Sequence, residues 1–335
     1  MVGLKDAQVT IVGLGLMGGS LAGALKKRGS CREVWGVARR EETIKEAMRR
    51  GFINVGTCDL AEGVEQADLI VLATPVRTIL ELIPQVGSLA PAGCLLMDLG
   101  STKARIVEAM KALPLYLQAI GGHPLCGKEA SGIEAAEADL YEGATFVLTP
   151  LRRTSPEALA LAQELVKAVG AQPLLMDAER HDRLVAAVSH LPYLLSVGLV
   201  AAAEEVAAED ELVWELAASG FRDTSRLAAS DVTMMLDILL TNRQAVGETL
   251  SRFARQLDAI AHLLEANDEE RLRNATQAVI ASEAKQSPYR KEEIASSQKP
   301  VLSEAEGTLL AMTRAEQLLR SLMEQVQRRR EGMFR

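Results

Sequence analysis

The sequence lacks the cysteine patterns and the positive charge that mark several common classes of protein. Its four cysteines, Cys31, Cys58, Cys94 and Cys126, have no CxxC spacing, which argues against both a zinc site and a disulfide framework. We therefore expect no bound metal, and reduced thiols that lie mostly in the core. The net charge of −8 disfavours nucleic acid as a partner, although an acidic protein can still hold a basic pocket for an anionic ligand.

Membrane and secretion signals are missing as well. No uninterrupted apolar run reaches the roughly 18 residues that a membrane span needs, and the first residues lack the basic start and cleavage site of a signal peptide. We therefore expect a cytoplasmic protein that does not act at a membrane. The chain has 335 residues, of which 48% are hydrophobic and 24% are charged, so its composition is that of a soluble protein with room for two domains.

The first part of the chain alternates between strand and helix patterns. A β-branched apolar stretch leads into a glycine turn and then into a helix that ends at Gly29. Further strand patterns follow at 33–39, 67–75, 93–101 and 145–150. This alternation predicts an α/β domain with a Rossmann-type, doubly wound parallel sheet, whose carboxyl edge carries the loops. We place this dinucleotide-binding domain at residues 1–150.

The pattern changes after Pro150. Residues 151–280 are rich in Ala, Leu, Glu and Arg at helical periodicity, which predicts an all-α domain for substrate binding and dimerisation. Residues 184–203 are too apolar for a surface helix, so we expect a helix that is buried on several sides, either within a homodimer or at the centre of its domain. Residues 281–310 indicate a flexible insertion and residues 311–335 a C-terminal helix.

A dinucleotide site is predicted at the first turn. Gly13, Gly15 and Gly18 form GxGxxG between a strand and a helix. The first glycine permits the tight turn, the second lets the backbone approach a pyrophosphate, and the third allows the helix to pack closely against the strand. The predicted cofactor-binding residues are Gly13, Gly15, Leu16, Met17, Gly18, Arg39, Arg40, Thr74 and Pro75.

The end of the second strand distinguishes NADP from NAD. NAD-binding chains usually place Asp or Glu there to bind the ribose hydroxyls, whereas this sequence has Arg39 and Arg40. Guanidinium groups suit a 2′-phosphate by charge and geometry, so we expect NADP as the cofactor, with NAD as the alternative. In that alternative the arginines pair with Glu41 and Glu42, and one of those acids binds the ribose.

Candidate reactive groups follow the later strands. Ser101 and Lys103 come after the fourth strand, and His123 lies in GGHPLCGKEASG (121–132), a stretch with too much glycine for a helix and too polar for a buried strand. We expect both loops to open toward the nicotinamide, with His123 as the base in a hydride transfer from a carbinol and Ser101 fixing its tautomer. A nucleophilic pair of Cys126 with His123 has no other support.

The helical domain contributes candidate substrate-binding residues. His181 and His190 are nine positions apart and face opposite sides of a continuous helix, so we expect His190 to bind substrate and His181 to cap or orient near a helix start. Arg222 and Arg226 are four positions apart, which places both on one helical face as a possible carboxylate clamp. The alternative is that they pair with Asp223 and Asp231.

Five motifs occur in order along residues 8–275: VGLGLMGGSLA, DLGSTK, GGHPLCGKEASG, SHLPY and GFRDTSRLA. Together they resemble the prephenate and arogenate dehydrogenases of tyrosine biosynthesis. The resemblance implies a Rossmann domain followed by a helical dimerisation domain, with the active site between them. It also implies an oxidative decarboxylation that makes the substrate ring aromatic.

By the same resemblance, His123 takes the proton of the ring hydroxyl with support from Ser101, and His190 and Arg226 contact the substrate, with Arg222 less constrained. The arginines after the second strand resemble NADP-using members, and GFRDTSR resembles the arogenate-using branch. Two alternatives are a β-hydroxyacid dehydrogenase and a non-catalytic NADP-binding sensor. The first needs a lysine base in the helical domain, and residues 170–200 contain no lysine.

Overall fold

The computed structural model describes residues 1–128 and 130–275, so the predicted insertion and C-terminal helix lie outside the described residues. The chain forms two compact units. Unit 1 comprises Met1–Val185 and Thr233–Arg243, and unit 2 comprises Ala186–Val232 and the chain from Gln244 onward. Each unit is described separately below.

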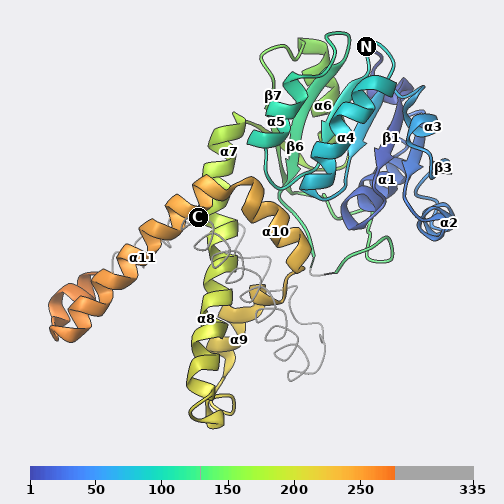
Figure 1. The fold of residues 1–335 in the computed structure, drawn as a ribbon. Coiled ribbons are helices and arrows are strands. Elements are labelled where there is room, and N and C mark those ends of the chain that lie inside the picture. The colour runs from blue at the N-terminus through green and yellow to red at the C-terminus, as the bar shows by residue number, and fades with distance from the viewer. Residues whose placement is uncertain (129, 276–335) are drawn as a thin grey trace, which may run out of the picture. The chain divides into compact units, whose positions relative to one another are not determined.

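Unit 1 is built on one sheet with helices on both faces (Figure 1). Across the sheet the strands are β3 (Val55–Thr57), β2 (Glu33–Val37), β1 (Gln8–Val12), β4 (Leu69–Leu72), β5 (Leu95–Asp98), β6 (Gln118–Pro124), β7 (Thr145–Pro150) and β8 (Gln172–Leu175). Neighbours from β3 to β6 pair in parallel. Strand β7 is antiparallel to β6, and β8 pairs with β7 in parallel, so the predicted parallel sheet is correct for six strands and is extended by two that run the other way.

The core of unit 1 has two layers because its central strands are buried on both faces. In β4, Leu69 and Val71 belong to one apolar cluster, whereas Ile70 and Leu72 belong to the other, as the alternation of side chains along a strand requires. The first layer is covered by α1 (Leu16–Arg28), α2 (Glu41–Arg49) and α6 (Pro156–Ala168), and the second by α3 (Leu60–Val64), α4 (Val76–Leu89) and α5 (Ala104–Lys111).

The α/β unit continues past Pro150, where we expected it to end. The helical pattern after that proline forms α6, whose apolar face packs on the sheet, and β8 adds an edge strand. Strand β8 gave no sequence signal because it is four residues long, contains Pro173 and is largely exposed. The described unit then includes α7 (Ala178–Val185) and most of α10 (Val232–Thr241).

The stretch GGHP is also not a loop: it forms the end of β6 and pairs with β7. We expected this stretch to be too polar for a buried strand, whereas it pairs within the sheet, and its glycines are required by close packing. A Cβ on Gly122 would lie 2.5 Å from the carbonyl oxygen of Asp98, a distance that real side chains do not reach. The glycines therefore let neighbouring chain segments approach β6 closely.

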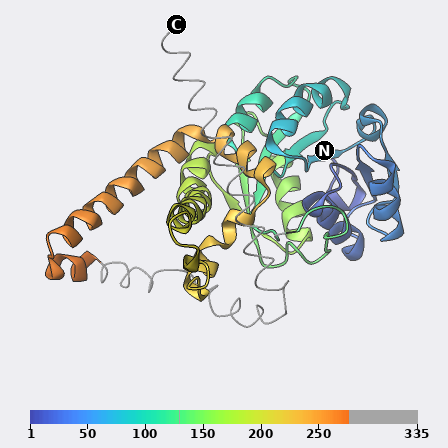
Figure 2. The same ribbon diagram turned by 60° about the horizontal axis from the view of Figure 1, so that its bottom comes forward.

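Unit 2 consists of helices. A π-helical segment, Ala186–His190, precedes α8 (Leu191–Ala207), and Pro192, which cannot donate a backbone hydrogen bond, explains the wider turn at that point. Helix α8 packs against α9 (Ser219–Ser225) and the 3-10 segments Glu211–Val213 and Arg226–Ala229. Helix α11 (Arg243–Glu265) follows as a long continuous helix (Figure 2).

One helical stretch, Ala178–Ala207, is long and apolar enough to cross a membrane by length and composition. It contains polar residues, so it does not form the continuous apolar run that the sequence criterion requires. Only 39% of its most apolar window is buried among the described residues, so the expected burial on several sides is not seen within the described part of one chain. All four cysteines are free. Only Cys94 is fully buried, so the expectation that most of them lie in the core is wrong.

Candidate active site

A pocket of about 640 Å³ lies in unit 1 at the carboxyl ends of β1, β2 and β4. Six of the residues predicted to bind cofactor line it: Gly13, Gly15, Arg39, Arg40, Thr74 and Pro75. The other three, Leu16, Met17 and Gly18, form the first turn of α1 and do not line the pocket. The pocket thus gathers loops that are far apart in the sequence at one edge of the sheet.

The turn between β1 and α1 depends on glycine. Gly13 has a φ of +102°, and a Cβ there would lie 2.8 Å from the carbonyl oxygen of Ala73. A Cβ on Gly18 would overlap the carbonyl oxygen of Gly13. Gly15 precedes α1 and makes no side-chain cap, so the first N–H groups of the helix have no intrahelical acceptor and suit an anion.

Thr74 provides a second sign that the pocket receives a polar ligand. Its hydroxyl is buried and has no hydrogen-bond partner within the described chain, yet Thr74 lines the pocket. Buried hydroxyl groups in proteins are nearly always hydrogen-bonded. A glycine cradle, an uncapped helix N-terminus and an unpaired hydroxyl fit the pyrophosphate of a dinucleotide.

The two arginines after β2 are exposed at the rim of this pocket. Neither forms an ion pair in the described part of the chain, whereas Glu41 pairs with Lys45 at 3.0 Å. The alternative in which Arg39 and Arg40 pair with the acids that follow them is therefore not the arrangement seen. Both arginines line the pocket, and none of the described residues that line it carries a carboxylate.

Lys103 does not open toward the pocket, contrary to our expectation. Its side chain is completely buried, forms an ion pair with the buried Asp98, and donates to the carbonyl oxygen of Gly122 at 2.7 Å. Burial lowers the pKa of Lys103, with Asp98 opposing the shift, and burial raises the pKa of Asp98, with Lys103 opposing. Asp98 also accepts the N–H of Gly122 at 3.1 Å, so the pair holds both polar groups of the residue before His123.

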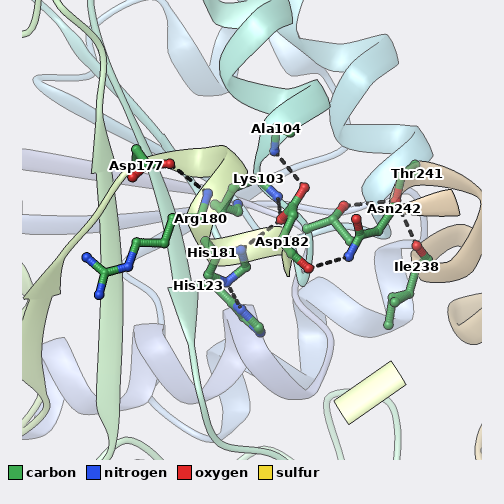
Figure 3. A network of polar contacts seen from close by, with 12 residues as sticks. Lys103, Ala104, His123, Asp177, Arg180, His181, Asp182, Ile238, Thr241 and Asn242 are labelled. Atoms are coloured by element: carbon green, nitrogen blue, oxygen red, sulfur yellow. Dashed lines mark hydrogen bonds and ion pairs between the residues drawn. The ribbon is translucent and has the colours of Figure 1, made fainter. Parts of the chain in front are cut away.

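His123 lies near the end of β6 and is half-buried. Its Nδ1 is 2.8 Å from Nε2 of His181, whose own Nδ1 is 2.8 Å from Oδ1 of Asp182 (Figure 3). We expected Ser101 to hold this imidazole, but Ser101 makes no hydrogen bond to His123 within the described residues. The position beside Nδ1 is instead occupied by His181, from α7.

Two protein-family models match this chain, one for each part of the sequence. Residues 21–175 match the family model of the prephenate dehydrogenase nucleotide-binding domain, and residues 177–278 match that of the prephenate dehydrogenase dimerization domain. The chain belongs to the prephenate dehydrogenase family. The first match ends where β8 ends, which agrees with the extended α/β unit rather than with a boundary at residue 150.

Relatives in this family align along most of the chain. It is 38% identical over 257 residues to a prephenate dehydrogenase of Lactococcus lactis subsp. cremoris, covering 76% of this chain and 70% of the relative, and 34% identical over 274 residues to that of Bacillus subtilis, covering 80% and 73%. The structure resembles A. aeolicus prephenate dehydrogenase in complex with hydroxyphenyl propionate and NAD+, with TM-score 0.79, 30% identity, and coverage of 85% and 100%. It also resembles Synechocystis arogenate dehydrogenase, with TM-score 0.74, 32% identity, and coverage of 84% and 100%.

Three predicted substrate residues of this family member belong to unit 2. His190 is buried at the junction of the π-helical segment and α8. Arg222 and Arg226 are exposed, but they do not share one α-helix as we expected, because α9 ends at Ser225 and Arg226 begins a 3-10 turn. Helix α8 packs against that turn.

Sequence reasoning missed His181 and Asp182. We compared His181 only with His190 on a helical wheel, whereas its partner lies 58 positions earlier in the chain, on a strand. A His-Asp pair at the start of a helix is a weak signal, and only the fold brings it to β6. For Cys126, by contrast, burial raises the pKa to about 11, which disfavours the thiolate that a nucleophile requires.

Removing the positive member of the buried pair should destabilise unit 1. In Lys103→Met the Asp98 carboxylate is left buried without its partner, and we expect the free energy of unfolding of unit 1 to fall by about 3–5 kcal/mol. The chain has two tryptophans, Trp35 in β2 and Trp214 in unit 2. Trp35 fluorescence during urea unfolding, in a Trp214→Phe background, measures this change in unit 1 alone.

The matched control is Asp98→Asn combined with Lys103→Met, which removes the buried charge as well. It should recover a measurable part of the lost stability. If the free energy of unfolding falls equally in the single and double variants, the loss does not come from the unpaired charge of Asp98.

Proposed function

We propose that this chain catalyses the oxidative decarboxylation of prephenate or arogenate in tyrosine biosynthesis, with NAD(P) as hydride acceptor. The observation that carries the proposal is the placement of His123 on the same sheet edge as the glycine pocket, backed by a buried hydrogen-bonded partner. The relatives named prephenate, cyclohexadienyl and arogenate dehydrogenase support the same reaction.

A bound nicotinamide would supply the acceptor for the hydride that leaves the ring carbon bearing the hydroxyl group. His123 takes the proton of that hydroxyl, so the carbonyl can form as the hydride departs. Loss of carbon dioxide then makes the ring aromatic, which supplies much of the driving force. The protein therefore needs chiefly to orient the two reactants and to accept one proton.

Substrate binding is proposed for residues of both units. Ser101 follows β5 at the carboxyl edge of the sheet, where its hydroxyl supports the reacting groups. In unit 2, His190 and Arg226 are proposed to bind the substrate, with Arg226 as the carboxylate partner and Arg222 assisting. These are small-molecule contacts, and we propose that neither nucleic acid nor a membrane takes part and that the enzyme is cytoplasmic.

NADP is the proposed cofactor. Arg39 and Arg40 line the pocket rim, and the first acid of the next helix is engaged by Lys45. Guanidinium groups bind phosphate in a bidentate manner and with favourable charge. A 2′-phosphate therefore fits this rim better than a bare ribose, for which a carboxylate is the usual partner.

A homodimer formed through α11 is proposed as the working assembly. The apolar residues of this helix recur in alternating steps of four and three, at Val246, Leu250, Phe253, Leu257, Ile260 and Leu264. Among the described contacts this heptad stripe is poorly covered: Leu257 is 52% exposed and Leu264 is 62% exposed. Helices with such a stripe pair with one another, and the helix lies within the match to the dimerization domain, so the partner is a second copy of the chain.

The reaction is tested by following absorbance at the reduced-nicotinamide band, with prephenate and arogenate each crossed with NADP and NAD. We expect turnover with at least one substrate, and faster with NADP. His123→Asn should lower kcat by about 10²–10⁴-fold, the range of a general base, while the dissociation constant for NADP stays unchanged.

His262→Asn is the matched control for that substitution, because His262 is an exposed histidine on α11. It should retain full activity. If no combination turns over although NADP binds by titration, a hydroxyacid dehydrogenase or a nucleotide sensor replaces this proposal.

Cofactor preference is tested by combining Arg39→Asp with Arg40→Ala. Loss of both guanidinium groups should weaken NADP binding, and the new carboxylate should favour NAD through the ribose hydroxyls. We expect the ratio of kcat/KM for NADP over NAD to fall by at least about tenfold, the equivalent of one charge-assisted hydrogen bond of about 1.4 kcal/mol. An unchanged ratio would refute the assignment of the 2′-phosphate to these arginines.

The dimer is tested with Leu257→Lys combined with Ile260→Lys. Burying a leucine or isoleucine contributes about 1.5–3 kcal/mol, so two lysines in the stripe should shift the protein from dimer to monomer in light scattering at micromolar concentration. Ala259→Lys with His262→Lys adds the same charge to the opposite side of α11 and should leave the dimer intact. A dimer that survives the first pair, or dissociates equally with the second, argues against this interface.

A further inference from the structure

The side chain of Asp182, which contacts His181 on the side away from His123, is held in one orientation by backbone groups. Asp182 accepts the N–H of Lys103 at 2.7 Å through Oδ1 and the N–H of Ala104 at 2.9 Å through Oδ2 (Figure 3). These amides begin α5, and a carboxylate is stabilised at a helix N-terminus. The carbonyl oxygen of Asp182 also accepts from Nδ2 of Asn242 at 2.7 Å. Asp182 is therefore a fixed, ionised hydrogen-bond acceptor.

This acceptor determines where the proton lies on His181. Oδ1 of Asp182 faces Nδ1 of His181, and because an ionised carboxylate can only accept, Nδ1 must carry the hydrogen. A neutral imidazole has one N–H, so Nε2 of His181 carries a lone pair. Both side chains are almost completely buried, with His181 1% exposed, and such hydrogen bonds are stronger away from water.

The tautomer of His181 in turn determines the tautomer of His123. Nε2 of His181 is an acceptor, and it lies 2.8 Å from Nδ1 of His123, so Nδ1 of His123 donates. The two rings are nearly perpendicular, at an interplanar angle of 78°, and the distance of 2.8 Å between the two nitrogens is that of a hydrogen bond. The remaining lone pair of neutral His123 is therefore on Nε2.

We propose that His181, held by Asp182, is a positioning residue that fixes the tautomer of His123, so that Nε2 is the nitrogen that takes the substrate proton. The inference rests on the proposed function for its use in catalysis. When Nε2 gains that proton, the resulting imidazolium donates more strongly through Nδ1, and the Asp182 carboxylate beyond His181 offsets its charge. Loss of a comparable tautomer-fixing carboxylate in hydrolytic triads costs up to about 10⁴-fold in rate.

The tautomer can be measured directly, because the chain has only four histidines. Long-range proton–nitrogen correlation spectra of protein labelled with ¹⁵N-histidine distinguish a hydrogen on Nδ1 from one on Nε2, and His123→Asn assigns the signal. At a pH where His123 is neutral, we expect its hydrogen on Nδ1. In His181→Leu it should move to Nε2, the form that neutral histidine prefers in water.

The activity test uses two substitutions at one position. His181→Leu removes the acceptor, and we expect kcat to fall at least about tenfold with KM within about threefold, since a misprotonated base loses most of the 10²–10⁴-fold that general-base catalysis contributes. His181→Gln offers an amide oxygen near the place of Nε2 and should restore part of kcat. The exposed His262→Leu serves as the matched control and should keep full activity.

Two results would overturn the inference: a hydrogen on Nε2 of His123 in the unsubstituted protein, or a His181→Leu enzyme within about twofold of normal kcat. The melting temperature of each variant separates misfolding from a rate effect, and a folded His181→Gln enzyme keeps the test decisive if His181→Leu unfolds. Because the spectra need no substrate, they test the tautomer even if neither prephenate nor arogenate is turned over, which would refute the proposed function alone.

Discussion

The buried ion pair between Lys103 and Asp98 is the contact on which the candidate active site depends. It joins the end of β5, the start of α5 and the backbone of β6, because both partners also bind Gly122. A buried pair of this kind contributes less to net stability than an apolar core would, since both charges lose their hydration. The pair instead fixes the position of Gly122, the residue before His123, because it is hydrogen-bonded to both the N–H and the C=O of that glycine.

Unit 1 also includes a segment from much later in the chain, which packs close to that ion pair. Residues 233–243 belong to unit 1, where Asp237 pairs with Arg77 of α4, and the hydroxyl of Thr241 lies 2.8 Å from that of Thr102. Asn242 completes the support of Asp182. The hydrogen-bonded side chains behind His123 are thus enclosed by three separate parts of the sequence, which keeps them out of water and in one arrangement.

The sequence predicts the parts of this molecule that follow a local rule. The glycine turn and the buried strands were found because positive φ at Gly13 and apolar runs leave clear patterns. The sequence predicts a loop at His123 because the stretch GGHP is too polar for a buried strand, and the reason for its glycine at position 122 is Asp98, which lies on another strand. The partner of His123 was missed for the same reason: Ser101 is close in the predicted sheet, whereas His181 reaches β6 only through the tertiary fold.

The placement of His123 on a strand rather than a loop matters for the chemistry. A loop residue samples several orientations, and each adds to the cost of aligning a base with a reacting hydroxyl. His123 has its backbone paired with β7 and its neighbour fixed by a buried ion pair, and its ring is hydrogen-bonded at Nδ1. In the proposed reaction aromatisation supplies much of the driving force, so orientation is the main contribution left for the protein, and the hydrogen bonds around His123 at this edge of the sheet suit that role.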